Sequence, residues 1–221
     1  MRALVVKPHR LEDPGTVDER LRERGVELVE HIPSEDPDIP PLDGFDLLLC
    51  FGAPWSVYGP EVRPWIETLL LRLRESAERD IPYLGICFGA QAHAKALGGD
   101  VFKTDRWELG FGTVNVVQDG PVEPGPWMMW HSDAFSLLEG ARLLATTESG
   151  PQAYAFGRSL VVQFHPEITP KIFGGWCQID DSDFERFGVD KEELRAELDE
   201  RADDIRARSH RLVDGFLDGA A

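Results

Sequence analysis

Residues 81–91 read Ile-Pro-Tyr-Leu-Gly-Ile-Cys-Phe-Gly-Ala-Gln, and this pattern predicts a strand, a tight turn and a helix in succession. The apolar run Tyr83–Ile86 lacks polar alternation, which is typical of a strand covered on both faces. Cys87 follows between two glycines, and the helix formers of residues 90–97 come next, up to two adjacent glycines. This is the spacing of a nucleophile elbow with a thiol in place of the hydroxyl. At the N-terminus of a helix, the helix dipole favours the thiolate of Cys87.

A reactive cysteine needs a base, and His165 is the best placed of the six histidines. It ends the apolar run Leu160–Phe164 and is followed by Pro166 and Glu167. The residue before a proline favours extended backbone, and in an extended segment His165 and Glu167 lie on the same side of the chain. The carboxylate can then accept a hydrogen bond from one ring nitrogen and leave the other facing the thiol. Cys87, His165 and Glu167 therefore form a candidate catalytic triad.

Each of these features also has a purely structural interpretation. A free cysteine is most often a small core residue, and a histidine at a strand end beside an acid is more often a satisfied structural group than a base. The two features occur together in this chain, and the combination favours the catalytic interpretation.

A triad that attacks a carbonyl also needs amide donors for the oxyanion. One candidate is the backbone N–H of Phe88, which directly follows the cysteine at the start of the helix. The loop that leaves the preceding strand, with Gly52 and Ala53, is the second candidate. By itself this loop is more simply interpreted as an ordinary proline-containing turn.

The first hundred residues alternate between strands and helices. The helix of residues 62–79 shows an apolar stripe at Trp65, Leu69 and Leu73. Such alternation indicates a doubly wound, mainly parallel α/β sheet, whose ligands bind at the carboxyl ends of the strands. The expected strands are Leu4–Val6, Val26–Val29, Leu47–Phe51 and Tyr83–Ile86, and the expected helices are Asp18–Arg24, Val62–Arg79 and residues 90–97.

The pattern changes after Gly99. Short strand-like runs separated by turns such as Asp119-Gly120 predict a mixed or antiparallel extension of the sheet. The charged segment Lys191–Leu217 predicts a terminal helix with a break near Ser209. Because no linker is visible, we expect one α/β domain over residues 1–221. The expected strands of this half are Gly112–Val117, Trp127–Trp130, Ala141–Thr146, Gln152–Phe156 and Leu160–Gln163.

Composition narrows the classes of function. The 221 residues carry a net charge of −17, which disfavours nucleic acid as a partner because phosphate binding requires a basic surface. No apolar run reaches about 18 residues, so we expect no membrane span. The three widely spaced cysteines favour a reducing cytoplasm over a disulfide framework. Neither a Cys-x-x-Cys motif nor a histidine pair indicates a metal site.

Three motifs together resemble the class I, triad-type glutamine amidotransferase domain, in particular the glutaminase domain of GMP synthetases and its stand-alone relatives. They are Gly-Ile-Cys-Phe-Gly-Ala-Gln at residues 85–91, Gly-Ala-Pro-Trp-Ser-Val-Tyr at 52–58 and Gln-Phe-His-Pro-Glu at 163–167. The resemblance implies a flavodoxin-like fold and hydrolysis of the γ-amide of glutamine through a thioester on Cys87, with no cofactor or metal. It also implies that His165 is the general base and acid and that Glu167 orients it.

The resemblance further implies how substrate is held. Gln91, four residues after the nucleophile, would help to hold glutamine, and the backbone of His131, Ser132 and Asp133 would bind its amino-acid end. Ala53 departs from the family, which usually has a glycine that supplies an oxyanion amide at this position. Because alanine resists positive φ, we expect the loop to be restricted in how it turns toward the oxyanion.

Other functions remain open at this point. We expect the ammonia to pass to a separate synthetase subunit or to be released, but the same triad could also hydrolyse or transfer other γ-glutamyl amides or peptides. The protease-like PfpI-type proteins also have a cysteine elbow. They tend to carry a histidine directly after the cysteine, where this chain has Phe88, and they would leave the motif at residues 163–167 unexplained. A catalytically silent binding subunit is disfavoured by the intact triad.

Overall fold

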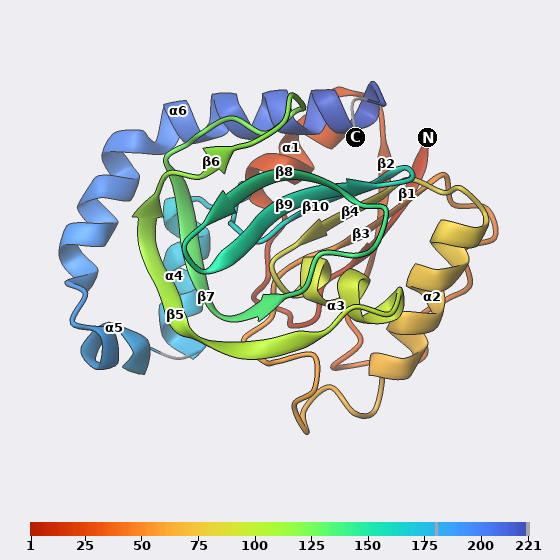
Figure 1. The fold of residues 1–221 in the computed structure, drawn as a ribbon, viewed down its shortest axis with the longest axis horizontal. Helices are drawn as coiled ribbons and strands as arrows, with labels where there is room; N and C mark the ends of the chain where they lie inside the picture. Colours follow the sequence, from red (N-terminus) through yellow and green to blue (C-terminus); the bar gives the residue numbers. More distant parts are fainter. Residues whose placement is uncertain (180, 220–221) are drawn as a thin grey trace.

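The computed structural model describes residues 1–179 and 181–219, and within them a central sheet of eight strands lies between two layers of helices (Figure 1). Five neighbouring strands of this sheet run parallel, and the other three continue it in antiparallel fashion. This confirms the predicted doubly wound, mainly parallel sheet with an antiparallel extension. The order across the sheet is β2 (Glu27–His31), β1 (Arg2–Val6), β3 (Leu47–Cys50), β4 (Tyr83–Ile86), β10 (Ser159–Val162), β9 (Gly150–Phe156), β8 (Arg142–Thr147) and β6 (Asn115–Val116).

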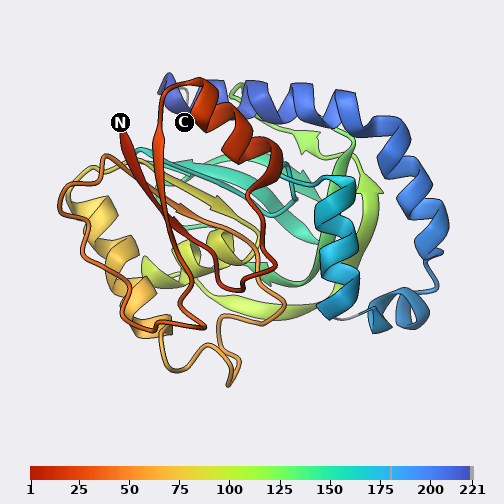
Figure 2. The ribbon, with the colours of Figure 1, turned by 180° about the vertical axis from the view of Figure 1, so that it is seen from behind.

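Alternate residues of the parallel strands belong to two different hydrophobic cores. In β1, Leu4 packs in the core that contains helices α2 and α3, whereas Val5 packs in the core that contains α1 and α6. Figures 1 and 2 show α1 and α6 on one side of the sheet and α2 and α3 on the other. Because both faces are covered, these strands are uninterrupted apolar runs. The helices are α1 (Gly15–Glu23), α2 (Ile66–Glu78), α3 (Phe88–Ala96) and α6 (Lys191–Leu217).

A third hydrophobic core lies beside the main sheet, under a two-stranded antiparallel ribbon of β5 (Val101–Gly112) and β7 (Trp127–Phe135). Helices α4 (Pro170–Ile179) and α5 (Ser182–Phe187) and the first half of α6 pack in this core. The ribbon is tied to the main sheet by an isolated bridge between Met128 and His165. This additional layer therefore borders the segment that carries the candidate base.

Two sequence-based predictions about helices were wrong. The helix expected from Val62 begins only at Ile66, because Pro64 lacks a backbone N–H and disfavours helical backbone at the preceding residue. The expected break of the terminal helix near Ser209 does not occur, since α6 runs continuously from Lys191 to Leu217. Ser209 is fully buried there, and its hydroxyl accepts a hydrogen bond from Thr16 Oγ1 of α1 at 2.8 Å.

The second half of the chain contains elements that we did not expect. Strand β5 was missed, and the strand expected over Gly112–Val117 is divided between the last residue of β5 and the two-residue strand β6. Strand β7 extends five residues beyond the expected Trp130, to Phe135. Helices α4 and α5 were also missed. Over the described residues, no helix is long and apolar enough to cross a membrane.

Candidate active site

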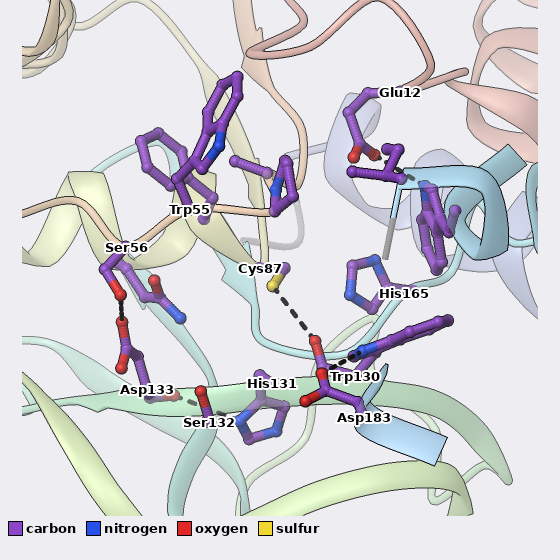
Figure 3. A pocket seen from close by; sticks show the side chains of 16 residues that line it. Glu12, Trp55, Ser56, Cys87, Trp130, His131, Ser132, Asp133, His165 and Asp183 are labelled. Carbon is purple, nitrogen blue, oxygen red and sulfur yellow. Dashed lines mark hydrogen bonds between the residues drawn. The ribbon is translucent and has the colours of Figure 1, made fainter. Parts of the chain in front are cut away.

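Four parallel strands of the main sheet end at one edge, and the segments that follow them line a common cavity. These are the segment after β1 with Glu12, the segment after β3 with Ala53, the elbow after β4 with Cys87, and the segment after β10 with His165. Parallel strands place their carboxyl ends side by side, so loops far apart in the sequence meet there. Residues of β7, α4 and α5 close the cavity on its other side (Figure 3).

Cys87 occupies a strained turn between β4 and α3. Its φ of 51° and ψ of −104° lie outside the regions that a non-glycine residue ordinarily adopts. The two flanking glycines are required by packing. A Cβ on Gly89 would lie 2.1 Å from the carbonyl oxygen of Cys50, and a Cβ on Gly85 would lie 2.7 Å from the ring of Tyr83. The predicted elbow is therefore present, and α3 packs tightly on the end of β3.

The thiol of Cys87 faces the cavity from a largely buried position, with 6% of the residue exposed. The side-chain amide of Gln163 donates to its sulfur over 3.4 Å, and the carbonyl oxygen of Trp130 lies 4.0 Å from the same atom (Figure 3). The sulfur thus lies beside an amide donor, at the N-terminal end of α3.

His165 and Glu167 lie on the same side of the extended segment after β10, as the spacing predicts. His165 Nδ1 lies 2.7 Å from Glu167 Oε1, and both side chains are buried. Burial lowers the pKa of His165, but the charges of Glu167 and of the Cys87 thiolate raise it by more, so it stands well above the usual 6.5. The imidazolium is thus the favoured form when the thiolate is present.

The ring of His165 is fixed on several sides. Its backbone N–H donates to the carbonyl oxygen of Met128 at 2.8 Å, and its ring meets that of Trp176 edge to face at 4.6 Å. Among the residues that the structure describes, Nε2 is buried and has no hydrogen-bond partner. Because Nδ1 is held by Glu167, Nε2 is the nitrogen left to exchange a proton with the Cys87 thiol on the same cavity wall.

The candidate oxyanion donors border the thiol. Phe88 opens α3, so its N–H belongs to the first turn, which has no carbonyl partner inside the helix. Neither Gly52 nor Ala53 has positive φ. The observed backbone of the loop therefore does not require a conformation that alanine resists, in contrast to our expectation for Ala53. Gly52 is instead constrained by its closeness to His165, whose Cε1 atom would lie 3.2 Å from a Cβ at that position.

The segment of β7 that was expected to bind substrate lines the same cavity. Asp133 accepts hydrogen bonds from Ser56 Oγ at 2.5 Å and Tyr58 Oη at 2.9 Å, which ties the loop after β3 to this strand. His131 Nε2 lies 3.0 Å from Glu108 Oε2 of β5. Ser132, which lies between His131 and Asp133 in β7, also lines the cavity.

Gln91 is buried in the second turn of α3 and belongs to a chain of side-chain amides. Its Nε2 donates to Gln163 Oε1 at 3.3 Å, and Gln163 in turn donates to the sulfur of Cys87. All residues assigned to the site from the sequence thus lie in or directly beside one cavity. Gly52 and Glu167 contact His165, which lines the cavity, without lining it themselves.

Several residues in or beside the cavity were missed by the sequence analysis. Gln163 had a detectable signal, because it precedes His165 by two residues and so lies on the same side of an extended segment. Glu12 had none, since it stands among other charged residues of a loop. Trp130, Trp176 and Asp183 come from elements that surround the sheet, and their approach to Cys87 depends on the tertiary packing of the third core.

The fold and the cysteine elbow define a doubly wound α/β protein with a nucleophile-type turn at the carboxyl edge of its sheet. Its architecture is similar to that of a glutamine amidotransferase of Thermotoga maritima, with a TM-score of 0.88 and 24% identity over 98% of both chains. A glutamine amidotransferase of Methylobacillus flagellatus gives a TM-score of 0.84 and 20% identity over 100% of this chain and 95% of that one. At these identities the likeness shows the fold.

The chain belongs to the class-I glutamine amidotransferase family, whose model matches residues 16–176. It is 31% identical over 166 residues to a glutamine-hydrolyzing GMP synthase of Aquifex aeolicus. The matched region covers 70% of this chain and 31% of that protein. It is also 31% identical over 157 residues to one subunit of the glutamine-hydrolyzing GMP synthase of Sulfolobus acidocaldarius, with 67% of this chain and 80% of that relative covered. The chain therefore spans about a third of the length of the first relative, and the resemblance read from its three motifs is confirmed.

Proposed function

We propose that this protein hydrolyses the γ-amide of glutamine to glutamate and ammonia, with Cys87 as nucleophile, His165 as general base and acid, and Glu167 as the residue that orients His165. The observation that carries the proposal is the convergence at one cavity of a thiol on a strained elbow and an imidazole whose Nδ1 is held by a buried carboxylate.

The reaction would proceed in two halves. Nε2 of His165 takes the proton of Cys87 Sγ, and the sulfur attacks the amide carbon to give a tetrahedral oxyanion beside the N–H groups of Phe88 and Ala53. Collapse forms the γ-glutamyl thioester and expels ammonia, which receives the proton from His165. A water molecule, deprotonated by His165, then attacks the thioester and releases glutamate.

The substrate would lie with its amino-acid end toward β7. His131, Ser132 and Asp133 line that part of the cavity, and Gln91 lies behind the elbow. We place the reaction in the cytoplasm, where reducing conditions keep Cys87 as a thiol. The ammonia would pass to a separate synthetase subunit. This is supported by the relative from Sulfolobus acidocaldarius, which is one subunit of a glutamine-hydrolyzing GMP synthase and is 31% identical to this chain.

One feature of the cavity favours a second candidate, hydrolysis or transfer of larger γ-glutamyl amides. Trp130, Trp176 and Asp183 also line the cavity. Figure 3 shows Trp130 and Asp183 on the same side of Cys87 as His165, which would protonate the leaving group. Ammonia needs no aromatic walls, whereas a substituted amine could pack against them.

The two candidates are separated by measuring product release from glutamine and from a panel of γ-glutamyl amides with the purified chain. If glutamine is the substrate, it has the highest kcat/KM of the panel, and a larger amide with a higher kcat/KM would establish the second candidate. In either case Cys87→Ala lowers turnover to the uncatalysed background, because the thioester route has no other nucleophile. Cys50→Ala and Cys177→Ala are matched controls that should keep the activity. Retention of more than a few per cent of the activity by Cys87→Ala would refute the proposed mechanism.

A further inference from the structure

A second buried carboxyl group borders His165 and has no part in the triad. Glu12 lies in the segment between β1 and α1, with 4% of the residue exposed. Its Oε2 atom accepts a hydrogen bond from the indole Nε1 of Trp176 at 3.0 Å. Figure 3 shows its carboxyl group on the same side of the cavity as His165.

Glu12 and His165 approach each other across the backbone of Gly52. A Cβ atom on Gly52 would lie 3.6 Å from Glu12 Oε2 and 3.2 Å from His165 Cε1. Both side chains therefore approach a position in the loop after β3 that carries no side chain. Both side chains are buried, and charges in a buried site interact more strongly than they do in water.

Few charged groups face Glu12 from the elements packed around it. They are Lys7 at the end of β1 and His165 and Glu167 after β10, while α4 contributes the neutral indole of Trp176. Burial raises the pKa of Glu12 to about 7, and the repulsion of Glu167 acts in the same direction, against the lowering effects of His165, Trp176 and Lys7. Glu12 therefore changes its charge close to neutral pH, beside the group that would exchange protons with Cys87.

We propose that Glu12 is a positioning residue that acts through His165, its carboxylate stabilising the imidazolium that forms when Cys87 loses its proton. In that step the S–H bond breaks, the sulfur keeps the electron pair, and the proton bonds to Nε2. The resulting imidazolium lies between two carboxylates, Glu167 and Glu12. When Glu12 is protonated, this second stabilisation is lost and the balance shifts toward the neutral thiol and imidazole. The inference rests on the proposed function, since it concerns the same proton transfer.

The direct test is an NMR titration of the His165 Cε1–H resonance in the full chain with labelled histidine and Cys87→Ser. The resonance is assigned by its loss in His165→Ala. Adding Glu12→Gln removes the charge but keeps an oxygen that accepts from Trp176. We expect the midpoint of the His165 titration to fall by about one pH unit, together with loss of the inflection that Glu12 produces near neutral pH. An unchanged midpoint would reduce Glu12 to a hydrogen-bond acceptor for Trp176 and overturn the proposal.

A matched control is available in the adjacent residue. Asp13 pairs with Lys171 on the outside of the cavity, with its side chain 39% exposed, so Asp13→Asn removes a charge from the same loop and should leave the midpoint unchanged. Should Glu12→Gln fail to fold, Trp176→Phe keeps the acid and removes its hydrogen-bond donor. The neutral form of Glu12 is then favoured, so its inflection must move to higher pH, and an inflection that stays in place would also overturn the proposal.

The assay with glutamine provides a second readout. Because Glu12 is ionised only above neutral pH, Glu12→Gln should lower kcat/KM about tenfold at about pH 8 and much less at about pH 6. A uniform loss at both pH values would indicate a merely structural role. The NMR titration contains no glutamine, so its outcome stays separate from that of the proposed hydrolysis. Loss of the glutamine reaction with an intact titration shift would refute the function and leave the Glu12–His165 interaction in place.

Discussion

His165 is the residue on which the neighbouring groups of the cavity act. Glu167 Oε1, 2.7 Å from Nδ1, fixes which nitrogen carries the proton, and the edge of Trp176 fixes the plane of the ring. Both contacts reach His165 from side chains that are themselves buried, so the imidazole has little freedom to leave the cavity wall. The orientation of a single ring thus depends on residues from two different elements.

A graded loss of activity should follow from this arrangement. We expect His165→Ala to reduce kcat about as much as Cys87→Ala, on the order of 10⁴-fold or more, because triad members act as a unit. Glu167→Gln should cost roughly tenfold less, because the amide oxygen can still accept from Nδ1–H. Steady-state kinetics on the three variants would measure this order. A Glu167→Gln variant as inactive as Cys87→Ala would assign the carboxylate of Glu167 a role beyond orienting His165.

Among the elements, those that face one uniform environment could be predicted from the sequence. Strands β1, β3, β4 and β10 are buried on both faces, so their apolar runs identified them. Strand β5 could not be found, because none of its twelve residues is buried and its side chains follow no alternation. Helices α4 and α5 are short, and their apolar residues are explained only by the third core, which the sequence does not reveal.

The same distinction applies to the site. Cys87, His165 and Glu167 could be found because each has a local signature, a glycine-flanked turn or a two-residue spacing. Glu12 and Trp176 are 164 positions apart and form their hydrogen bond only because the segment after β1 and helix α4 meet at the cavity. Such contacts depend on how the layers pack, and no local pattern in the sequence indicates them.

The attachment of α3 to β3 can be tested at Gly89. A methyl group at this position would meet the carbonyl carbon and oxygen of Cys50 at 2.8 and 2.1 Å, both backbone atoms that cannot rotate away. We expect Gly89→Ala to lower the free energy of unfolding by about 2 kcal/mol or more, as overpacking does, and to displace Cys87. Urea titration and the rate of Cys87 alkylation would measure the two effects.

Gly174→Ala is the matched control for Gly89→Ala, since it is also a helical glycine, and its nearest neighbour, Arg195 Nη1, would lie 4.0 Å from the new Cβ. It should be neutral or stabilise the protein by up to about 1 kcal/mol, because alanine has the higher helix propensity. If the two variants had equal stabilities, the close contact with Cys50 would not matter for the fold.

At the scale of the whole molecule, the buried acid links stability to pH. The folded chain retains a proton on Glu12 up to a pKa of about 7, whereas an unperturbed glutamate releases it near 4.5. Between these values the folded state binds more protons than the unfolded state, so the contribution of Glu12 to stability is full below this window and is lost as the pH rises through it.

The variant Glu12→Gln should remove this dependence. We expect the wild type to lose about 3 kcal/mol more stability than the variant between about pH 4.5 and about pH 8, and the variant to be the more stable protein at the upper end. Urea denaturation at a series of pH values gives the two curves. Parallel curves would mean that Glu12 ionises in the folded protein as it does in water.

The measurement that tests the proposed chemistry most directly is covalent labelling with an electrophilic analogue of glutamine, read by peptide mass spectrometry alongside residual activity. The thiol of Cys87 shares its cavity with His165, whereas Cys50 is fully buried and burial raises the pKa of its thiol far above the usual range. We predict one adduct per chain on the peptide that contains Cys87, loss of glutamine hydrolysis in proportion to labelling, and protection by excess glutamine. Labelling confined to Cys50 or Cys177, or full activity in a chain labelled at Cys87, would contradict a thioester mechanism at this cavity.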